Sequence, residues 1–213
     1  MRPSPSQELR VEYRDASADD SRDIARFICM AGGGLYEFLF DDFVPFFAAV
    51  DFLSIGIGSE EYPISFRNCY VAIDSASGEL VGAANVFPAD ELREQTYGFL
   101  PTERQDHVRP IMQLQDWRSM FLNALAVSEN YRGLGIGARL LDWAQERAKA
   151  AGFERLSLHV WADNTPAVRF YKARGFVELA TAPVASHPRL AHTGGSILMR
   201  QAIHGSTCRA NGL

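Results

Sequence analysis

The sequence predicts a mixed α/β fold of the α+β type, in which one mostly antiparallel sheet with a central parallel strand pair is flanked by helices. Stretches in which apolar and polar residues alternate predict strands, and apolar residues three or four positions apart predict helices. A strand–helix–strand unit over residues 118–160 requires a parallel pair. Two strands joined by a short turn at residues 68–87 require an antiparallel pair.

The first half of the chain is predicted to hold two helical regions between a first strand and a hairpin. Ser17 is a suitable N-cap for the first helix, glycines at 32–34 end it, and Pro45 divides the second helical region. The expected elements are a strand at 9–14, a helix at 16–34, a helix in two pieces at 35–53, and strands at 68–74 and 79–87.

The second half is predicted to alternate strands and helices. Prolines and charges over 88–117 allow at most short helices there. Gly152 ends the longest helix, and Thr165 is the expected N-cap of the last one, with Pro166 at its first position. The expected elements are strands at 118–127, 155–160, 176–184 and 196–203, and helices at 135–152 and 165–175.

Length and composition indicate a single soluble domain at 9–203, with tails at 1–8 and 204–213. The net charge of -5 argues against a nucleic-acid partner, since such proteins usually carry a basic face. The sequence lacks the roughly 20 consecutive apolar residues of a membrane span, so we expect no membrane partner. Three cysteines without a CxxC pair are typical of a reducing, cytoplasmic compartment, and no metal-ligand spacing is present.

The stretch NYRGLGIGARLL at 130–141 predicts an anion-binding loop at the start of a helix. Gly133, Gly135 and Gly137 let a ligand approach the backbone, and the first N–H groups of a helix have no partner within it. The helix dipole favours negative charge there, and the guanidinium of Arg132 suits a phosphate. We therefore expect this loop to bind a pyrophosphate.

Two other phosphate-binding loops fit this stretch less well. A P-loop requires Lys-Ser or Lys-Thr after its last glycine, and neither occurs here. The dinucleotide pattern GxGxxA is matched by Gly133, Gly135 and Ala138, but residues 128–132 separate it from the preceding strand. A dinucleotide-binding oxidoreductase thus remains a less favoured alternative.

The segment LNALAVSENYRGLGIGARLL resembles motif A of the GCN5-related N-acetyltransferase (GNAT) family, whose signature is matched by Arg132, Gly135 and Gly137. The segment LHVWADNTPAVRFYKARGF resembles motif B of that family, matched by Asn164, Tyr171, Gly175 and Phe176. The agreement covers residues 118–177. It implies the acyl-CoA N-acyltransferase fold, with its parallel strand pair splayed apart, and transfer of an acetyl group from acetyl-CoA to an amine.

The resemblance also implies which residues bind the cofactor. Backbone amides of 132–138 would hold the pyrophosphate, the pantetheine arm would pair with the backbone of 125–127, and Asn164 would bond that arm. The implied cofactor-binding residues are Leu125, Ala126, Val127, Arg132, Gly133, Leu134, Gly135, Ile136, Gly137, Ala138, Asn164 and Tyr171.

Catalysis by direct attack of the amine is implied as well. The N–H of Val127 would polarise the thioester carbonyl, and Tyr171 would protonate the leaving thiolate. Asn123 stands where many family members carry a glutamate; an amide takes no proton but can hold a water or orient the substrate. The base could then be that water, His159 or Glu37, although an amine of low pKa needs no strong base, and His159 fits a packing role better.

The acceptor stays open between a small-molecule amine and a peptide amine. The first two helices and residues 88–117 are implied to wall its pocket, and homodimers are common in the family. Asp41, Asp42, Asp51, Glu60 and Glu61 would favour a cationic amine or simply form a solvated acidic face. Asn123 in place of an acid leaves a second alternative, a non-catalytic acyl-CoA sensor of the same fold.

Overall fold

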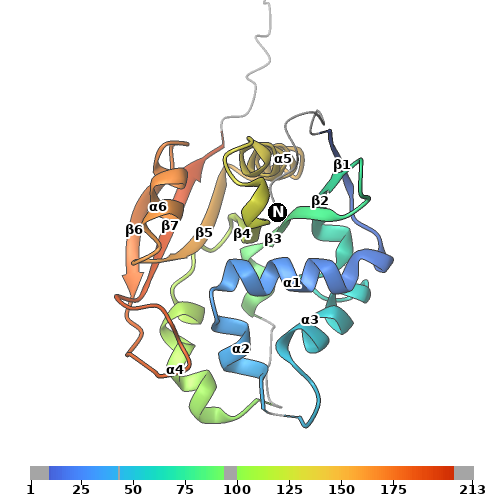
Figure 1. The fold of residues 1–213 in the computed structure, drawn as a ribbon. Coiled ribbons are helices and arrows are strands. Elements are labelled where there is room, and N and C mark those ends of the chain that lie inside the picture. The colour runs from blue at the N-terminus through green and yellow to red at the C-terminus, as the bar shows by residue number, and fades with distance from the viewer. Residues whose placement is uncertain (1–9, 43, 94–99, 204–213) are drawn as a thin grey trace, which may run out of the picture.

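A seven-stranded sheet forms the centre of the computed structural model, which describes residues 10–42, 44–93 and 100–203. The strands follow the order β1-β2-β3-β4-β5-β7-β6, and only β4 and β5 pair in parallel (Figure 1). The strands are β1 (Val11–Asp15), β2 (Cys69–Asp74), β3 (Leu80–Pro88), β4 (Met120–Val127), β5 (Arg155–Trp161), β6 (Val177–Ala182) and β7 (Ser196–Ala202). The predicted mixed sheet is confirmed. The expected tails at 1–8 and 204–213 lie outside the described residues.

Helices cover both faces of this sheet. The helices are α1 (Ser21–Gly32), α2 (Leu35–Phe40), α3 (Ala49–Gly58), α4 (Thr102–Gln113), α5 (Ile136–Ala150) and α6 (Thr165–Lys172). Helices α1 and α3 share one hydrophobic cluster with a face of the sheet, and α5 and α6 share another with the opposite face. Helix α4 lies beside α2 at one end of the molecule (Figure 1).

Helix α5 shows how the sequence pattern produces this packing. Its buried residues are Ile136, Leu140, Leu141, Ala144 and Ala148, the apolar stripe expected from helical spacing. Burial of each large aliphatic side chain contributes about 1.5–3 kcal/mol. Gly152 follows the helix with a φ of 78°, a left-handed conformation that ends it as predicted.

Besides shifts of a few residues at other helix ends, the structure differs from the predicted helices in three places. Residues 102–113 form one 12-residue helix, α4, although only short helices were expected there. Pro110 lies inside it, but Val108 and Ile111 are buried, and their tertiary packing outweighs the missing backbone donor. The second helical region breaks between Phe40 and Ala49, and α3 runs on to Gly58. The third difference is the N-cap of α6, which borders the site and is described with it below.

Candidate active site

The parallel strands β4 and β5 separate partway along their length. Their paired residues are Met120 with Leu156, Phe121 with Ser157 and Leu122 with Leu158. Beyond Leu122, β4 continues to Val127, while β5 keeps its pairing with β7 as far as Trp161. A gap therefore opens between the two strands at their carboxyl ends, which confirms the splayed pair.

The backbone of β4 faces this gap at alternate residues. The N–H of Ser128 donates to the Val81 carbonyl at 2.8 Å, so Ser128 is bonded towards β3. Because backbone groups alternate sides along an antiparallel ladder, the N–H groups of Leu125 and Val127 are directed into the gap. The Nε of Arg132 donates to the Val127 carbonyl at 3.2 Å. The Val127 N–H is thus oriented as its predicted role requires.

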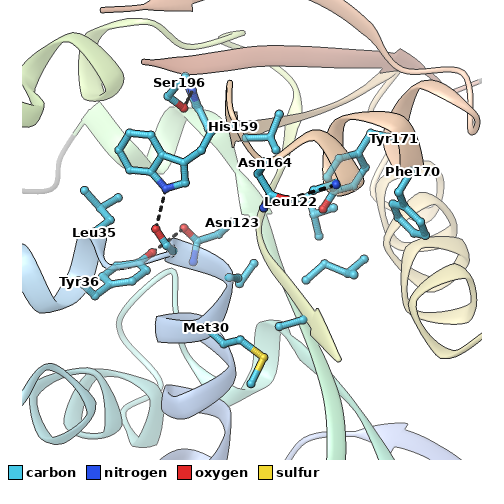
Figure 2. Close-up of a pocket in the computed structure, with 18 of the residues that line it drawn as sticks. Met30, Leu35, Tyr36, Leu122, Asn123, His159, Asn164, Phe170, Tyr171 and Ser196 are labelled. Carbon is cyan, nitrogen blue, oxygen red and sulfur yellow. Dashed lines mark hydrogen bonds between the residues drawn. The ribbon is translucent and has the colours of Figure 1, made fainter. Parts of the chain in front are cut away.

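Asn123 forms a β-bulge at the point where the strands part. Ala124 of β4 pairs with Asn85 of β3, and Leu122 pairs with the next β3 residue, Val86. Asn123 lies between Leu122 and Ala124 and is therefore an extra residue in β4. Its Nδ2 donates to Asn85 Oδ1 at 3.0 Å. Its Oδ1 accepts from the Tyr36 hydroxyl at 3.2 Å (Figure 2). The amide is therefore fixed in orientation at the edge of the gap.

The glycine-rich loop leads into α5 next to the gap. Gly133 and Gly135 have φ values of 81° and 84°, and a Cβ added at either would meet no protein atom within 4 Å. Arg139 makes the first intrahelical bond, to the Gly135 carbonyl, so the N–H groups of residues 136–138 have no helical partner. The loop has the open backbone surface that a pyrophosphate requires.

A hydrogen bond that the sequence did not predict anchors this loop. The Tyr131 hydroxyl donates to the Asp74 carboxylate at 2.7 Å and ties the loop to the end of β2. This carboxylate, together with partial burial, raises the pKa of Tyr131 to about 12. The phenol therefore stays protonated and keeps donating across the neutral pH range. The two residues lie 57 positions apart, and no local pattern connects them.

Helix α6 carries the two residues expected from motif B. Asn164, not Thr165, is its N-cap, since Asn164 Oδ1 accepts from the Ala167 N–H at 3.3 Å. The Asn164 side chain therefore orders the helix start while it borders the cavity. The Tyr171 ring packs edge-on against Phe170 and Phe176, and burial raises the pKa of its hydroxyl.

One cavity of about 770 Å³ joins the loop, the gap and a chamber beyond Asn123. Its lining includes Asn123 and every residue implied to bind the cofactor except Leu134, whose side chain is about half exposed on the loop. Helices α1, α2 and α4 wall the chamber, as expected for the acceptor pocket. Its polar lining residues are Tyr36, Gln105, Gln115, Asn123, His159 and Ser196. Figure 2 shows Tyr36, Asn123 and His159 around the chamber, with Tyr171 and Phe170 on the cofactor side.

His159 is held as a neutral side chain. Its Nε2 donates to the Leu114 carbonyl at 2.7 Å, so its Nδ1 accepts from the Ser196 hydroxyl at 3.1 Å. Burial lowers its pKa to about 4. Glu37, the other candidate base, does not line the cavity. It lies beside Cys29, where burial, and then the charge of Glu37, raise the pKa of the thiol to about 12.

Two kinds of site are not found in the described part of the chain. Within residues 10–42, 44–93 and 100–203, no three His, Cys, Asp or Glu side chains gather as a metal site. In the same residues, no helix has the length and apolar character that crossing a membrane requires.

Solved structures share this fold. An N-acetyltransferase from Staphylococcus aureus Mu50 superposes with a TM-score of 0.64 at 19% identity, over 89% of this chain and 99% of that one. Ard1 from Thermoplasma volcanium superposes with a TM-score of 0.57 at 18% identity, over 91% and 98% of the two chains. The fold is that of the N-acetyltransferases.

The sequence matches the model of the Acetyltransferase (GNAT) family over residues 35–176, and the chain belongs to this family. It is 33% identical over 90 residues to N-alpha-acetyltransferase 40 of Saccharomyces cerevisiae. This match covers 38% of this chain and 32% of that protein. It is also 36% identical over 80 residues to a mycothiol acetyltransferase of Jonesia denitrificans. This match covers 38% of this chain and 24% of that protein. The matches thus span well under half of these curated relatives.

Proposed function

We propose that the protein is an acetyl-CoA-dependent N-acetyltransferase that transfers acetyl directly to a primary amine of a small molecule or peptide. The observation that carries this proposal is the end of β4–β5 pairing at Leu122 and Leu158, beside the open glycine-rich loop. A gap lined by backbone donors suits an extended pantetheine arm, and the loop suits the diphosphate at its end.

The residues present fit acetyl-CoA. The N–H groups of 136–138 and the guanidinium of Arg132 would hold the diphosphate at the positive end of α5. Arg132 has no ion pair with a carboxylate of the described residues, so its charge is available to a phosphate. The backbone of Leu125 and Val127 would pair with the arm. Acetyl-CoA supplies the activated acyl group.

Two groups of the chain serve the chemical step in this proposal. The Val127 N–H would donate to the carbonyl oxygen as negative charge develops on it, a fixed donor that needs no reorganisation. The Tyr171 hydroxyl would give its proton to the departing sulfur. Because burial raises the pKa of this phenol, it carries the proton at every working pH.

The comparisons give no support to the two alternatives, an acyl-CoA sensor and a dinucleotide-binding oxidoreductase. The proposal has two further parts. Three cysteines without a CxxC pair support a cytoplasmic location, and the family resemblance supports assembly as a homodimer. Light scattering of the purified protein tests the second.

The experiment that tests the activity has two readouts. The melting temperature is measured with acetyl-CoA and with NAD(H), and free thiol release is measured against a panel of amines. We expect a rise in melting temperature with acetyl-CoA alone and amine-dependent thiol release. A rise with acetyl-CoA but no thiol release with any amine would favour the sensor. A rise with NAD(H) alone would overturn the proposal.

A further inference from the structure

In the described part of the chain, no acidic side chain that could hold a cationic amine lines the chamber beyond Asn123. Among the described residues, no Asp or Glu lines the cavity, and its two charged lining residues are Arg132 and Arg174. Both lie at the cofactor end, Arg174 with its guanidinium 3.8 Å from the centre of the Phe170 ring. The acidic residues Asp41, Asp42, Asp51, Glu60 and Glu61 all lie outside the lining. A buried ammonium would therefore lack a counter-charge, which is costly.

The described lining residues of the chamber also include no group that removes a proton near neutral pH. His159 is neutral, both its ring nitrogens are bonded, and its pKa of about 4 makes it a weak base. Asn123 is an amide that bonds Asn85 and Tyr36. The site is thus better suited to an amine that arrives already neutral than to an ammonium that must first be deprotonated.

Next to the chamber, contacts join α2, α4 and residues 183–195, which link β6 to β7. His107 Nε2 contacts the Ala185 carbonyl at 3.0 Å, and the guanidinium of Arg189 donates to the Asp41 carbonyl at 3.2 Å. Leu190 packs into a buried cluster with Phe38 and Val108, where the three segments meet. These contacts hold the three segments together next to the chamber, and the mainly apolar lining there suits a compact acceptor.

Gln115 supplies a polar atom that has no partner in the chamber wall. Its Nε2 donates to the Ile111 carbonyl at 2.9 Å, while its Oε1 is buried without a hydrogen bond to any described residue. An unsatisfied buried acceptor is unfavourable, so a ligand N–H at this position would relieve it. Gln115 lines the cavity, as do the apolar residues Leu35, Val108, Ile111 and Met112.

We propose that the acceptor is a compact, largely apolar amine that is neutral at physiological pH, of the arylamine class, with an N–H accepted by Gln115 Oε1. This inference rests on the proposed acetyltransferase function. The amine nitrogen forms a bond to the acetyl carbon as the carbon–sulfur bond breaks. The sulfur takes the Tyr171 proton, the nitrogen loses its surplus proton to water, and water returns a proton to the Tyr171 phenolate. No basic side chain is needed, because the lone pair of a neutral amine is free to attack.

The test compares two isomers, p-toluidine and benzylamine, which have the same atoms but differ in basicity. We expect kcat/KM at about pH 7.4 to favour p-toluidine at least about tenfold, because an alkylamine with a pKa near ~10 is almost fully ionised there. For p-toluidine, kcat/KM should be flat between about pH 6 and 9, whereas for benzylamine it should rise about tenfold per pH unit. A short peptide with an apolar N-terminal residue should react more slowly than p-toluidine.

Two variants test the role of Gln115. Gln115→Leu should raise the KM for p-toluidine about fivefold or more, as expected for loss of one hydrogen bond, without changing the melting shift given by acetyl-CoA. Gln115→Glu places a carboxylate in the chamber and should move the preference towards benzylamine. A wild-type preference for benzylamine or for the peptide would overturn the inference, as would inactivity with every amine. Absence of a melting shift with acetyl-CoA would instead contradict the acetyltransferase function itself.

Discussion

Leu122 on β4 lies opposite Leu158 on β5, and this pair is the last of the parallel ladder between the two strands. The next residue of β4, Asn123, is the bulge that bonds Tyr36 on α2 and Asn85 on β3. The place where the strands part is therefore fixed by hydrogen bonds from Asn123 to β3 and to α2. Cofactor and acceptor would meet at this point.

Tyr171→Phe should lower kcat about a hundredfold and change the dissociation constant of acetyl-CoA by no more than about twofold. The variant removes the proposed acid but keeps the ring that packs against Phe170 and Phe176. Steady-state kinetics and calorimetric titration measure the two quantities. Unchanged kcat, or equal losses in turnover and affinity, would count against the acid role.

Tyr131→Phe should have the opposite effect. It removes the hydroxyl that holds the glycine-rich loop to Asp74, so the loop becomes less ordered. Because the bond is made to a charged group, its loss should raise the dissociation constant of acetyl-CoA about tenfold, with kcat nearly unchanged. Calorimetric titration of acetyl-CoA measures this dissociation constant. A loss confined to kcat would show that the loop does not depend on this bond.

Asp20→Asn should destabilise the fold in a pH-dependent way. Two hydrogen bonds from the Arg14 guanidinium, with bonds from Ser17, lower the pKa of Asp20 from its ordinary value of 3.8 to about 2. A lowered carboxyl pKa adds stability that is complete above the unfolded-state pKa and is lost as pH falls through the folded-state pKa. Because Arg14 is 44% exposed, we expect the variant to lose only about 1–2 kcal/mol at neutral pH.

Urea unfolding of wild type and Asp20→Asn at several pH values measures this difference. The two free energies of unfolding should differ by a constant amount above about pH 5 and converge as pH falls from about 4 towards 2. A difference that is the same at pH values of about 3 and 7 would contradict the ion-pair explanation.

His159 should leave no ionisation in the rate profile near neutral pH. Burial lowers its pKa to about 4, so the folded protein binds its proton less readily than the unfolded chain does. Its contribution to stability is complete above the unfolded-state pKa of about 6.5 and is lost as pH falls towards about 4. Measured with a neutral amine, kcat/KM should show no inflection between about pH 6 and 7. An inflection there that His159→Gln abolishes would identify His159 as a base.

The sequence was most informative where function depends on local structure. The glycines at 133 and 135 and the helix start after them are close in the chain, so one short stretch predicted the open loop. The stripe on α5 and the hairpin of β2 and β3 follow from periodicity and turn chemistry in the same way.

Features that depend on distant contacts were not predictable from the sequence. Helix α4 is stabilised by Val108 and Ile111 packing against other segments, and its own residues include a proline. The Tyr131–Asp74 bond and the unpartnered Gln115 Oε1 depend on how separate elements meet. Thr165 was the wrong N-cap because Asn164, one residue earlier, reaches the free N–H of Ala167.

The central claim is that the backbone around Gly135 binds the diphosphate of acetyl-CoA, and two matched valine variants test it most directly. Gly135 and Gly152 flank the two ends of α5, have φ values of 84° and 78°, and offer open space to a Cβ. Valine at either position should therefore cost a similar strain, about 1–2 kcal/mol of stability.

Calorimetric titration of acetyl-CoA into both variants is the decisive measurement. Gly135→Val should raise the dissociation constant at least about a hundredfold, equivalent to about 2.8 kcal/mol, while Gly152→Val should stay within about twofold of wild type. Equal affinity of the two folded variants would contradict the claim.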